Sequence, residues 1–324
     1  MSDWRKQFIL KQFTKKGLGL EIGPSHSPLA PKKDGYNIEI VDHASQKKLI
    51  KKYKALNIDT SNIEEVDYVW DGKQTLSELI NKPKSYDYII ASHLVEHTTD
   101  LVTFLQDCEK LLKPAGKLCL VIPDKRYCFD YFRFPSTTGD ILEAYYNKNI
   151  RHTSGKVFDF LINSAKRGKN AAWSSNDRST LSLMYELKFA KQESKKAQKS
   201  ESYIDIHNWM FTPNSLKLLV YDLQSLGLIK LAYADEMPTQ GFEFFAVLSS
   251  KSPLFTAPRV KMLTRVMEDV KEMYSVDQAN LKKETATLNE QIGMLEAEIL
   301  AMKNSKRWRI ADKPAKVVKA LRKK

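Results

Sequence analysis

Short apolar runs alternate with amphipathic segments along the first part of the chain. The runs are rich in Val, Ile, Leu and Tyr, which favour β-strands, and they end at polar or turn-forming residues. The predicted strands are 18–22, 36–42, 66–70, 86–92 and 117–123, and the predicted helices are 4–16 and 99–113. Alternating strands and helices predict a parallel sheet that is covered on both faces.

The alternation stops between residues 124 and 210 and then resumes. The interrupting segment mixes aromatic residues, prolines and polar runs, so we expect an irregular or helical insertion there. Beyond it, the predicted elements are a helix over 212–227 and strands over 228–234 and 242–250, the last two as a hairpin-like pair. The pattern therefore predicts one α/β domain of seven strands over residues 1–251.

Residues 258–303 follow the heptad pattern of a coiled coil. Apolar residues recur alternately three and four positions apart, from Val260 to Tyr274 and again from Leu281 to Met302. The two stretches join through Gln278 with two consecutive spacings of four, which is a local stutter. We expect a coiled coil that makes the protein a homo-oligomer. The alternative is a helix folded back onto the α/β domain.

The positive charge is concentrated at the C-terminal end. The chain carries a formal net charge of +13, and residues 303–324 supply +9 of it, with ten Lys or Arg against Asp312. The rest of the chain has no strong excess of positive charge, which argues against a nucleic-acid partner. Hydrophobic residues make up 42% and charged residues 28%, as in ordinary globular proteins.

The basic tail, residues 304–324, also carries an apolar stripe. Trp308 and Ile310 precede Val317, Val318 and Leu321 among the basic residues. A Trp-tipped apolar stripe with a Lys/Arg face is typical of a helix on an anionic membrane surface. We expect peripheral contact with the inner membrane face; the alternative is a solvated basic tail.

Several features favour a cytoplasmic location. The N-terminal segment has charges within its apolar pattern and no small-residue cleavage site, so a signal peptide is not expected. No apolar run approaches the length of a membrane span. The three cysteines, Cys108, Cys119 and Cys128, have neither disulfide-framework nor zinc spacing, which suits a reducing compartment.

The first predicted strand ends in an unusual sequence, GLGLEIGPSHSP. A glycine turn after a strand lets backbone N–H groups approach a ligand, but the third glycine of the dinucleotide fingerprint is absent. Glu21 would repel a pyrophosphate and attract a ligand that carries an ammonium and a sulfonium. Asp42 ends the second strand 19 residues after Gly23, where an acid can bind ribose hydroxyls, and Asp71 ends the third.

The segments LEIGPSHSP, IEIVDH and YDYIIASHLVEH resemble the strand motifs of class I S-adenosylmethionine-dependent methyltransferases. The resemblance covers about residues 17–250 and implies a Rossmann-like, mostly parallel seven-stranded sheet. The segments IPDKRYCFDYFR and DIHNWMFTP resemble a bacterial subgroup associated with surface-polysaccharide biosynthesis. One departure is Ser25, where the family commonly has a glycine. The implied cofactor-binding residues are Glu21, Gly23, Pro24, Ser25, Asp42, Asp71, Gly72, Ser92 and His93.

Each implied binding residue also has a simpler interpretation. Glu21 could cap a turn, and Asp42 or Asp71 taken singly could be loop acids. His93 and His97 do not form a zinc motif, because the spacing lacks the acid of H-E-x-x-H and a further ligand. We therefore predict no metal site from the sequence.

Methyl transfer to a hydroxyl needs a base, and histidine is the natural base near neutral pH. All six histidines lie before residue 210. We predict His207 as the base, with His97, Asp124 and His152 as further candidates. A loop histidine stacked on Trp209 is the alternative for His207.

The insertion at 124–210 would act as a lid over the acceptor. Its aromatic residues could stack on sugar rings or form the small core of an added layer. Its arginines, Arg126, Arg133, Arg151 and Arg178, could bind an acceptor carboxylate or phosphate.

These features predict a methyltransferase acting on a sugar hydroxyl of a surface polysaccharide or its lipid-linked precursor. Three alternatives remain open. The chain could be an inactive scaffold that docks glycosyltransferase partners through its coiled coil. It could also methylate a small molecule or a nucleic acid.

Overall fold

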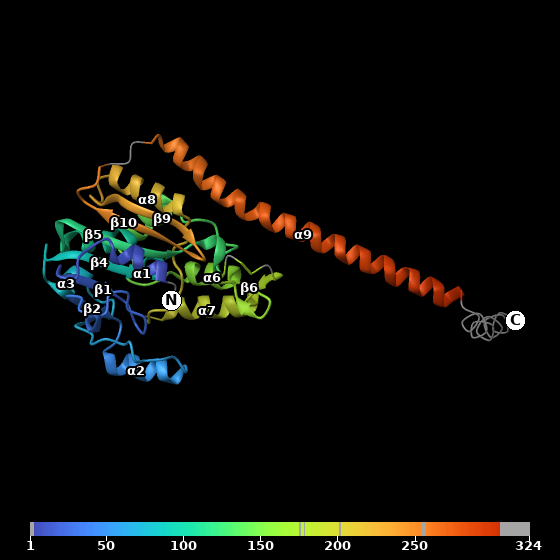
Figure 1. The fold of residues 1–324 in the computed structure, drawn as a ribbon, viewed down its shortest axis with the longest axis horizontal. Coiled ribbons are helices and arrows are strands. Elements are labelled where there is room, and N and C mark those ends of the chain that lie inside the picture. Colours follow the sequence, from blue (N-terminus) through green and yellow to red (C-terminus); the bar gives the residue numbers. More distant parts are fainter. Residues whose placement is uncertain (1–2, 175, 178, 201, 254–256, 305–324) are drawn as a thin grey trace. The chain divides into compact units, whose positions relative to one another are not determined.

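The computed structural model describes residues 3–174, 176–177, 179–200, 202–253 and 257–304 (Figure 1). The chain divides into two compact units, with the boundary between Asp269 and Val270. The predicted basic tail lies outside the described residues. Among the described helices, none has both the length and the apolar character needed to cross a membrane.

The first unit is built on a seven-stranded sheet with the order β3-β2-β1-β4-β5-β10-β9. Its strands are β1 (Gly19–Ile22), β2 (Ile38–Asp42), β3 (Tyr68–Val69), β4 (Tyr86–Ser92), β5 (Leu112–Pro123), β9 (Ala232–Gln240) and β10 (Glu243–Ser249). The first five strands run parallel, and β10 is antiparallel to both β5 and β9. This confirms the mostly parallel sheet and the terminal antiparallel pair. The chain order reverses between β1 and β4, where open α/β sheets bind their ligands.

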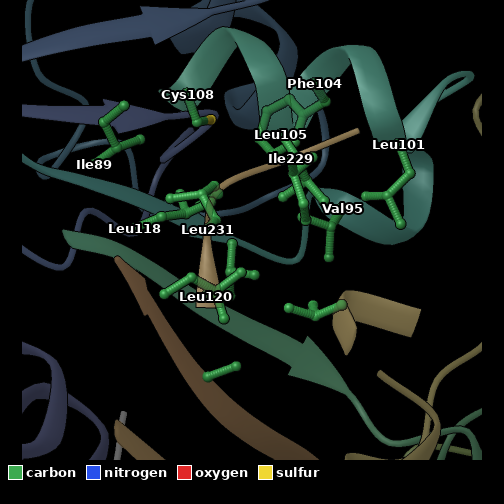
Figure 2. Close-up of a cluster of buried hydrophobic side chains, with 14 of the residues drawn as sticks. Ile89, Val95, Leu101, Phe104, Leu105, Cys108, Leu118, Leu120, Ile229 and Leu231 are labelled. Carbon is green, nitrogen blue, oxygen red and sulfur yellow. The ribbon is translucent and has the colours of Figure 1, made fainter. Parts of the chain in front are cut away.

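Helices and apolar side chains cover both faces of this sheet. The helices are α1 (Asp3–Leu10), α2 (Gln46–Ala55), α3 (Leu76–Ile80), α4 (Leu101–Leu111) and α8 (Pro213–Ser225), with short 3-10 turns η1 (Lys32–Asp34), η2 (Val95–His97) and η3 (Lys125–Tyr127). On one face, α4 packs Leu101, Phe104, Leu105 and Cys108 toward Ile89, Leu118 and Leu120 of the sheet (Figure 2). On the other, Phe8 and Ile9 of α1 pack with Tyr88 and Phe245.

Local sequence signals position α4 and α8. Asp100 caps α4 by accepting the amide of Thr103 (3.0 Å), as predicted for its N-terminus. Thr212 forms a capping box with Ser215, and Pro213 occupies the first turn of α8. Both helices therefore begin where their sequences predict.

Two predicted elements differ in extent from those observed. The first helix ends at Leu10 rather than at residue 16. The first strand of the terminal pair, β9, begins at Ala232 rather than at residue 228, and it continues through polar residues to Gln240. Ile229 and Leu231, which the prediction placed in this strand, are buried just before it. β9 lies at the edge of the sheet, so its polar side chains face solvent and leave no apolar alternation to detect.

The segment between β5 and α8 first forms α5 (Thr138–Tyr146), which contributes Ile141 and Ala144 to the main core of the sheet. It then forms an added layer (Figure 1) of α6 (Ser154–Asn163), β6 (Ala165–Arg167), β7 (Asn170–Ala171), β8 (Leu181–Leu183) and α7 (Leu187–Lys199). The strands pair as a small antiparallel sheet that the sequence did not predict. Val157, Leu161, Ala190, Ala197 and Ile206 form its small core. Its action as a lid remains a prediction.

The predicted heptad region is helical from Arg259 to Asn304, a single helix of 46 residues (α9). Its first turns belong to the first unit, where the Nε of Arg259 donates to Asp222 (2.8 Å) and the side-chain amide of Asn214 donates to Asp269 (2.9 Å). Further along, the heptad residues Leu288, Ile292, Leu295 and Ile299 are about half exposed, at 52%, 52%, 57% and 48%. The helix is confirmed, and its self-association remains a prediction.

Candidate functional site

The turn after β1 has the left-handed backbone that its glycine predicts. Gly23 has φ 67°, and Ser25, which replaces the family's usual glycine, also has a positive φ of 50°. The amide of Gly23 donates to the carbonyl of Val41 (2.7 Å) and that of Ser25 to the carboxylate of Asp42 (2.9 Å). The turn is therefore tied to the end of β2. Ser25 thus adopts a left-handed conformation that glycine takes more readily.

Glu21 is 1% exposed and uses its carboxyl group within the turn region. Its two oxygens accept the amides of Leu29 (2.7 Å) and Ala30 (3.2 Å). Burial raises the pKa of Glu21 to about 7, although these two hydrogen bonds oppose the shift. The side chain of Glu21 therefore fixes the loop that follows Pro24. Contact between Glu21 and the cofactor remains a prediction.

The three predicted acids belong to three adjacent strands: Glu21 lies in β1, Asp42 ends β2 and Asp71 comes shortly after β3. Asp42 is buried and also accepts the amide of His43 (2.7 Å). Asp71 is exposed in the loop after β3, beside the left-handed Gly72, and accepts the amide of Lys73 (3.1 Å). We call residues 21–25, 42 and 71–72 the cofactor edge.

The segment after β4 continues this edge. The hydroxyl of Ser92 accepts from the guanidinium of Arg5 (2.5 Å), and His93 takes a left-handed φ of 50°. The Nε2 of His93 lies 3.1 Å from the carboxylate of Glu243, which also pairs with Arg5 (3.3 Å). Ser92 ends β4 and His93 follows it, next to β1, and their contact with the cofactor remains a prediction.

Glu96, in η2, is completely buried. Neither of its carboxylate oxygens accepts a hydrogen bond from the part of the chain that the structure describes. Two imidazoles lie near it, with His93 Nδ1 at 3.6 Å and His97 Nε2 at 3.9 Å. The backbone carbonyl of Glu96 accepts the amides of Asn208 and Trp209, which brings the segment after the insertion to this point.

That segment supplies His207, the predicted base. His207 is 4% exposed, and its Nδ1 donates a short hydrogen bond to Asp130. Its ring meets the ring of His97 edge-on, with the ring centres 4.7 Å apart, and His97 Nδ1 lies 2.9 Å from Asp205. We call His93, Glu96, His97 and His207 the histidine cluster.

Asp130 was missed by the sequence analysis. Burial alone would raise its pKa, but His207 and the guanidinium of Arg133 (2.8 Å) hold the pKa at about 2. The carboxylate is therefore ionised and fixes Nδ1 of His207 as the donor. The only signal in the sequence was an acid three residues before Arg133.

The other candidate bases are placed differently. Asp124 is fully buried and accepts from Arg126 (2.7 Å) and from the hydroxyl of Thr239 (2.6 Å), so its oxygens are already engaged. Burial and the nearby charge of His97 lower the pKa of His152 to about 4. His152 lines a small pocket together with Asp140, Lys156, Asn208 and Trp209. His97 has a raised pKa, because Asp205 and Glu96 outweigh the opposing effect of burial.

Aromatic side chains lie against the histidine cluster. The partly exposed Trp173 stacks on Phe129 (5.1 Å between ring centres) and contacts Phe242 (5.1 Å). Its ring centre lies 5.8 Å from that of His93 and 6.3 Å from that of His207. By contrast, Trp209 is 1% exposed and belongs to the sheet core, so it does not stack on His207.

Three of the arginines predicted to bind the acceptor are engaged within the protein. Arg126 pairs with Asp124, and Arg133 bridges Asp130 and Asp159 (3.0 Å). Arg151 donates to the carbonyl of Ser200 (3.0 Å). Arg178 lies outside the described residues.

Comparisons with known proteins agree with this geometry. Residues 35–120 match the family described as "Methyltransferase domain". A human relative, the mitochondrial ubiquinone biosynthesis O-methyltransferase, is 40% identical over 93 residues, which cover 22% of this chain and 25% of the relative. The chain thus spans about a quarter of the length of this curated relative.

Solved structures also resemble the chain at low identity. A protein from Pyrococcus horikoshii is 14% identical with a TM-score of 0.39, covering 77% of this chain and 92% of that one. A SAM-dependent methyltransferase from Methanosarcina mazei is 14% identical with a TM-score of 0.36, covering 74% and 95%. The sequence matches make residues 35–120 similar to a methyltransferase domain.

Proposed function

We propose that the protein transfers the methyl group of S-adenosylmethionine to a hydroxyl of a sugar in a bacterial surface polysaccharide or its lipid-linked precursor. The observation that carries the proposal is the buried Asp130–His207 pair beside the carboxyl end of β4. Hydroxyl methylation needs a group that takes up the hydroxyl proton, whereas methylation of a more acidic oxygen or of a thiolate does not.

The reaction is an in-line displacement in which the acceptor oxygen forms a bond to the methyl carbon as the carbon–sulfur bond breaks. The sulfonium loses its charge, so the protein's work is to align the two reactants and to receive the proton. Asp130 engages Nδ1 of His207, which leaves Nε2 as the nitrogen that can accept a proton. Asp130 would therefore act as a positioning residue for His207.

The aromatic face formed by Trp173, Phe129 and Phe242 supports a ring-shaped acceptor. Trp173 is partly exposed and close to both His93 and His207. Aromatic rings bind the apolar face of a sugar or another planar or ring-shaped molecule while its polar rim stays free to react. The acceptor hydroxyl would lie between this face and the cofactor edge.

A second candidate acceptor is a small molecule with a free hydroxyl. The name of the human relative, an O-methyltransferase of ubiquinone biosynthesis, favours it. The two acceptor classes predict different products in the cell. A sugar acceptor gives a methyl group on an isolated glycan, and a small-molecule acceptor leaves the glycan unchanged.

The deciding experiment is mass spectrometry of surface glycans from cells with and without the protein. We expect one methyl group per modified sugar to disappear in its absence. An unchanged glycan from a protein that binds S-adenosylmethionine would contradict the sugar acceptor and favour a small-molecule acceptor. A chain that binds no S-adenosylmethionine in calorimetry would favour the inactive scaffold, and salt-sensitive binding to nucleic acid would favour a nucleic-acid substrate.

We also infer that α9 pairs with a second copy of the chain. The half-exposed residues of its heptad positions, from Leu288 to Ile299, form an apolar seam of the kind that coiled coils bury. Light scattering on the full chain should give a mass of at least two chains, and replacing Ile292 and Leu295 by Asp should give a single chain. A monomeric wild-type protein would contradict this. Membrane contact and glycosyltransferase docking stay proposals for the tail and for α9.

A further inference from the structure

Three imidazoles surround one buried carboxylate in the histidine cluster. Glu96 is 0% exposed, and its two oxygens accept no hydrogen bond from the described residues. His93 Nδ1 and His97 Nε2 approach it to 3.6 and 3.9 Å, which is near but beyond hydrogen-bond length. One ligand-capable atom from each of Glu96, His97 and His207 lies within 4.8 Å of the other two.

The other nitrogen of each imidazole lies close to a carboxylate. Nδ1 of His207 donates to Asp130, Nδ1 of His97 lies 2.9 Å from Asp205, and Nε2 of His93 lies 3.1 Å from Glu243. Histidines that bind metals commonly donate their second N–H to a carboxylate, which fixes the tautomer and raises the basicity of the ligating nitrogen. The nitrogens left over on His93 and His97 are the ones that approach Glu96.

The surroundings of Glu96 also favour a cation. Glu96 accepts no hydrogen bond from the described residues, and the imidazoles of His93 and His97 lie 3.6 and 3.9 Å from its carboxylate. The guanidiniums of Arg133 and Arg5 pair with the outer acids, Asp130 (2.8 Å) and Glu243 (3.3 Å). A cation bound between Glu96 and the imidazoles would place a positive charge in direct contact with this buried carboxylate.

The spacing of the ligand atoms suits a small ion. Two ligand atoms that are each about 2.1 Å from a tetrahedral ion lie about 3.4 Å apart. The Glu96–His97 separation of 3.9 Å requires about half an ångström of contraction, and His207, whose ligand atom lies within 4.8 Å of the other two, would have to move closer by up to about 1.4 Å. The side chains of His93 and His97 are each 25% exposed, which leaves a route for the ion and a coordination position open to another ligand.

We propose that Glu96, His97 and His207 bind a divalent first-row transition-metal ion, with His93 beside them as a further ligand. Imidazole nitrogens with one carboxylate favour Zn²⁺, Co²⁺, Mn²⁺ or Fe²⁺ over Mg²⁺ and Ca²⁺, which prefer oxygen ligands. A second grouping, Cys128, Asp130 and His207, is also close together. Its Asp130 is already engaged by His207, Arg133 and Cys128, so Glu96 is the better ligand.

The proposed site differs from what the local sequence predicts. His93 and His97 form no zinc motif by their spacing, and the additional ligand comes from His207, 110 positions beyond His97. An ion bound through Nε2 of His207 would occupy the nitrogen that the proposed function uses to receive the acceptor's proton, so one chain cannot use His207 in both ways at once. Metal binding itself does not depend on that function.

The test uses the full chain, freed of metal by a chelator and then dialysed. Titration with Co²⁺ should give one ion per chain, with visible d–d absorption of a nitrogen- and oxygen-ligated site, and Zn²⁺ should displace it. Mg²⁺ should not compete. Glu96→Gln should weaken Co²⁺ binding at least tenfold, while Glu290→Gln, at an exposed position of α9, should match the wild type.

His97→Asn gives a second, independent variant in case Glu96→Gln does not fold. A wild-type chain that binds no Co²⁺ or Zn²⁺ would overturn the proposal, as would a folded pair of variants that bind Co²⁺ like the wild type. Calorimetry with S-adenosylmethionine on the metal-free chain separates the two proposals. A chain that binds S-adenosylmethionine but no metal ion would contradict the proposed metal site without contradicting the proposed methyltransferase function.

Discussion

The two halves of the candidate site are assembled in different ways. The cofactor edge is built from short contiguous pieces: Gly23 and Ser25 turn directly after β1, and Asp42 ends the neighbouring strand and accepts the amide of Ser25 (2.9 Å). The histidine cluster joins distant segments, and Asp130 meets His207 across 77 positions of sequence. A site made of neighbouring residues leaves a spacing that can be detected, whereas a site assembled by the fold does not.

The largest expected effect comes from breaking the cluster at His207. Replacing His207 by Gln removes the imidazole that receives the proton or binds the ion, so methyl transfer should fall by about 10²- to 10⁴-fold. The affinity for S-adenosylmethionine should stay unchanged, because the cofactor edge is a separate part of the site. The measurement is transfer of labelled methyl groups to lipid-linked glycan from cells that lack the protein.

His152→Gln provides the comparison for this variant. His152 is also buried, and its ring nitrogens have no hydrogen-bond partner among the described residues. If His152→Gln abolished transfer and His207→Gln did not, the base would be His152, and the Asp130–His207 pair would be structural.

A smaller loss is expected from Asp130→Asn. The neutral amide oxygen accepts the Nδ1–H of His207 more weakly than the carboxylate does. We therefore expect kcat to fall by about 10- to 100-fold while KM for S-adenosylmethionine stays the same. Asp159→Asn is the matched control, because Asp159 accepts from the same Arg133 (3.0 Å) without touching a histidine. Equal losses in the two variants would mean that Arg133, and not the orientation of His207, controls the rate.

The cofactor edge is tested by Asp42→Asn. Asp42 accepts the amides of Ser25 and His43, and its charge is the one predicted to bind the ribose. Losing a charged hydrogen bond should weaken S-adenosylmethionine binding by about 10- to 100-fold. Asp59→Asn, an exposed loop acid bonded to Ser61, should bind like the wild type. An unchanged affinity in Asp42→Asn would remove Asp42 from the cofactor edge.

The sequence predicts what depends on local pattern. The apolar strands, the Asp100 and Thr212 caps and the glycine turn each follow from a few neighbouring residues, and all are observed. Asp130 had no such signal, because its role depends on contact with His207 and Arg133. The same holds for Glu96, because its burial without a hydrogen-bond partner among the described residues depends on how the chain folds.

The small sheet of the insertion escaped prediction for a related reason. Its strands are two or three residues long, so alternation cannot be detected. Pairing between β6 and its neighbours, and not the sequence of any one strand, stabilises it.

The smallest expected effect comes from the protonation of Glu21, which changes the free energy of unfolding with pH. Burial raises its pKa from 4.5 to about 7, even though the amides of Leu29 and Ala30 donate to it. Because the folded pKa lies above the unfolded one, ionisation opposes folding. The stabilising contribution of this group is complete below pH 4.5 and is lost as the pH rises to about 7. Glu21→Gln should remove this part of the pH dependence of the unfolding free energy.

The same pKa makes the predicted contact with the cofactor measurable. If the ammonium group of S-adenosylmethionine lies near Glu21, binding favours the carboxylate and should release about half a proton at pH 7. Calorimetry in two buffers with different ionisation enthalpies measures that release. Glu21→Gln should release none, and Glu290→Gln should behave like the wild type. Equal proton release from wild type and Glu21→Gln would place the ammonium elsewhere and leave Glu21 as the group that holds the loop after Pro24.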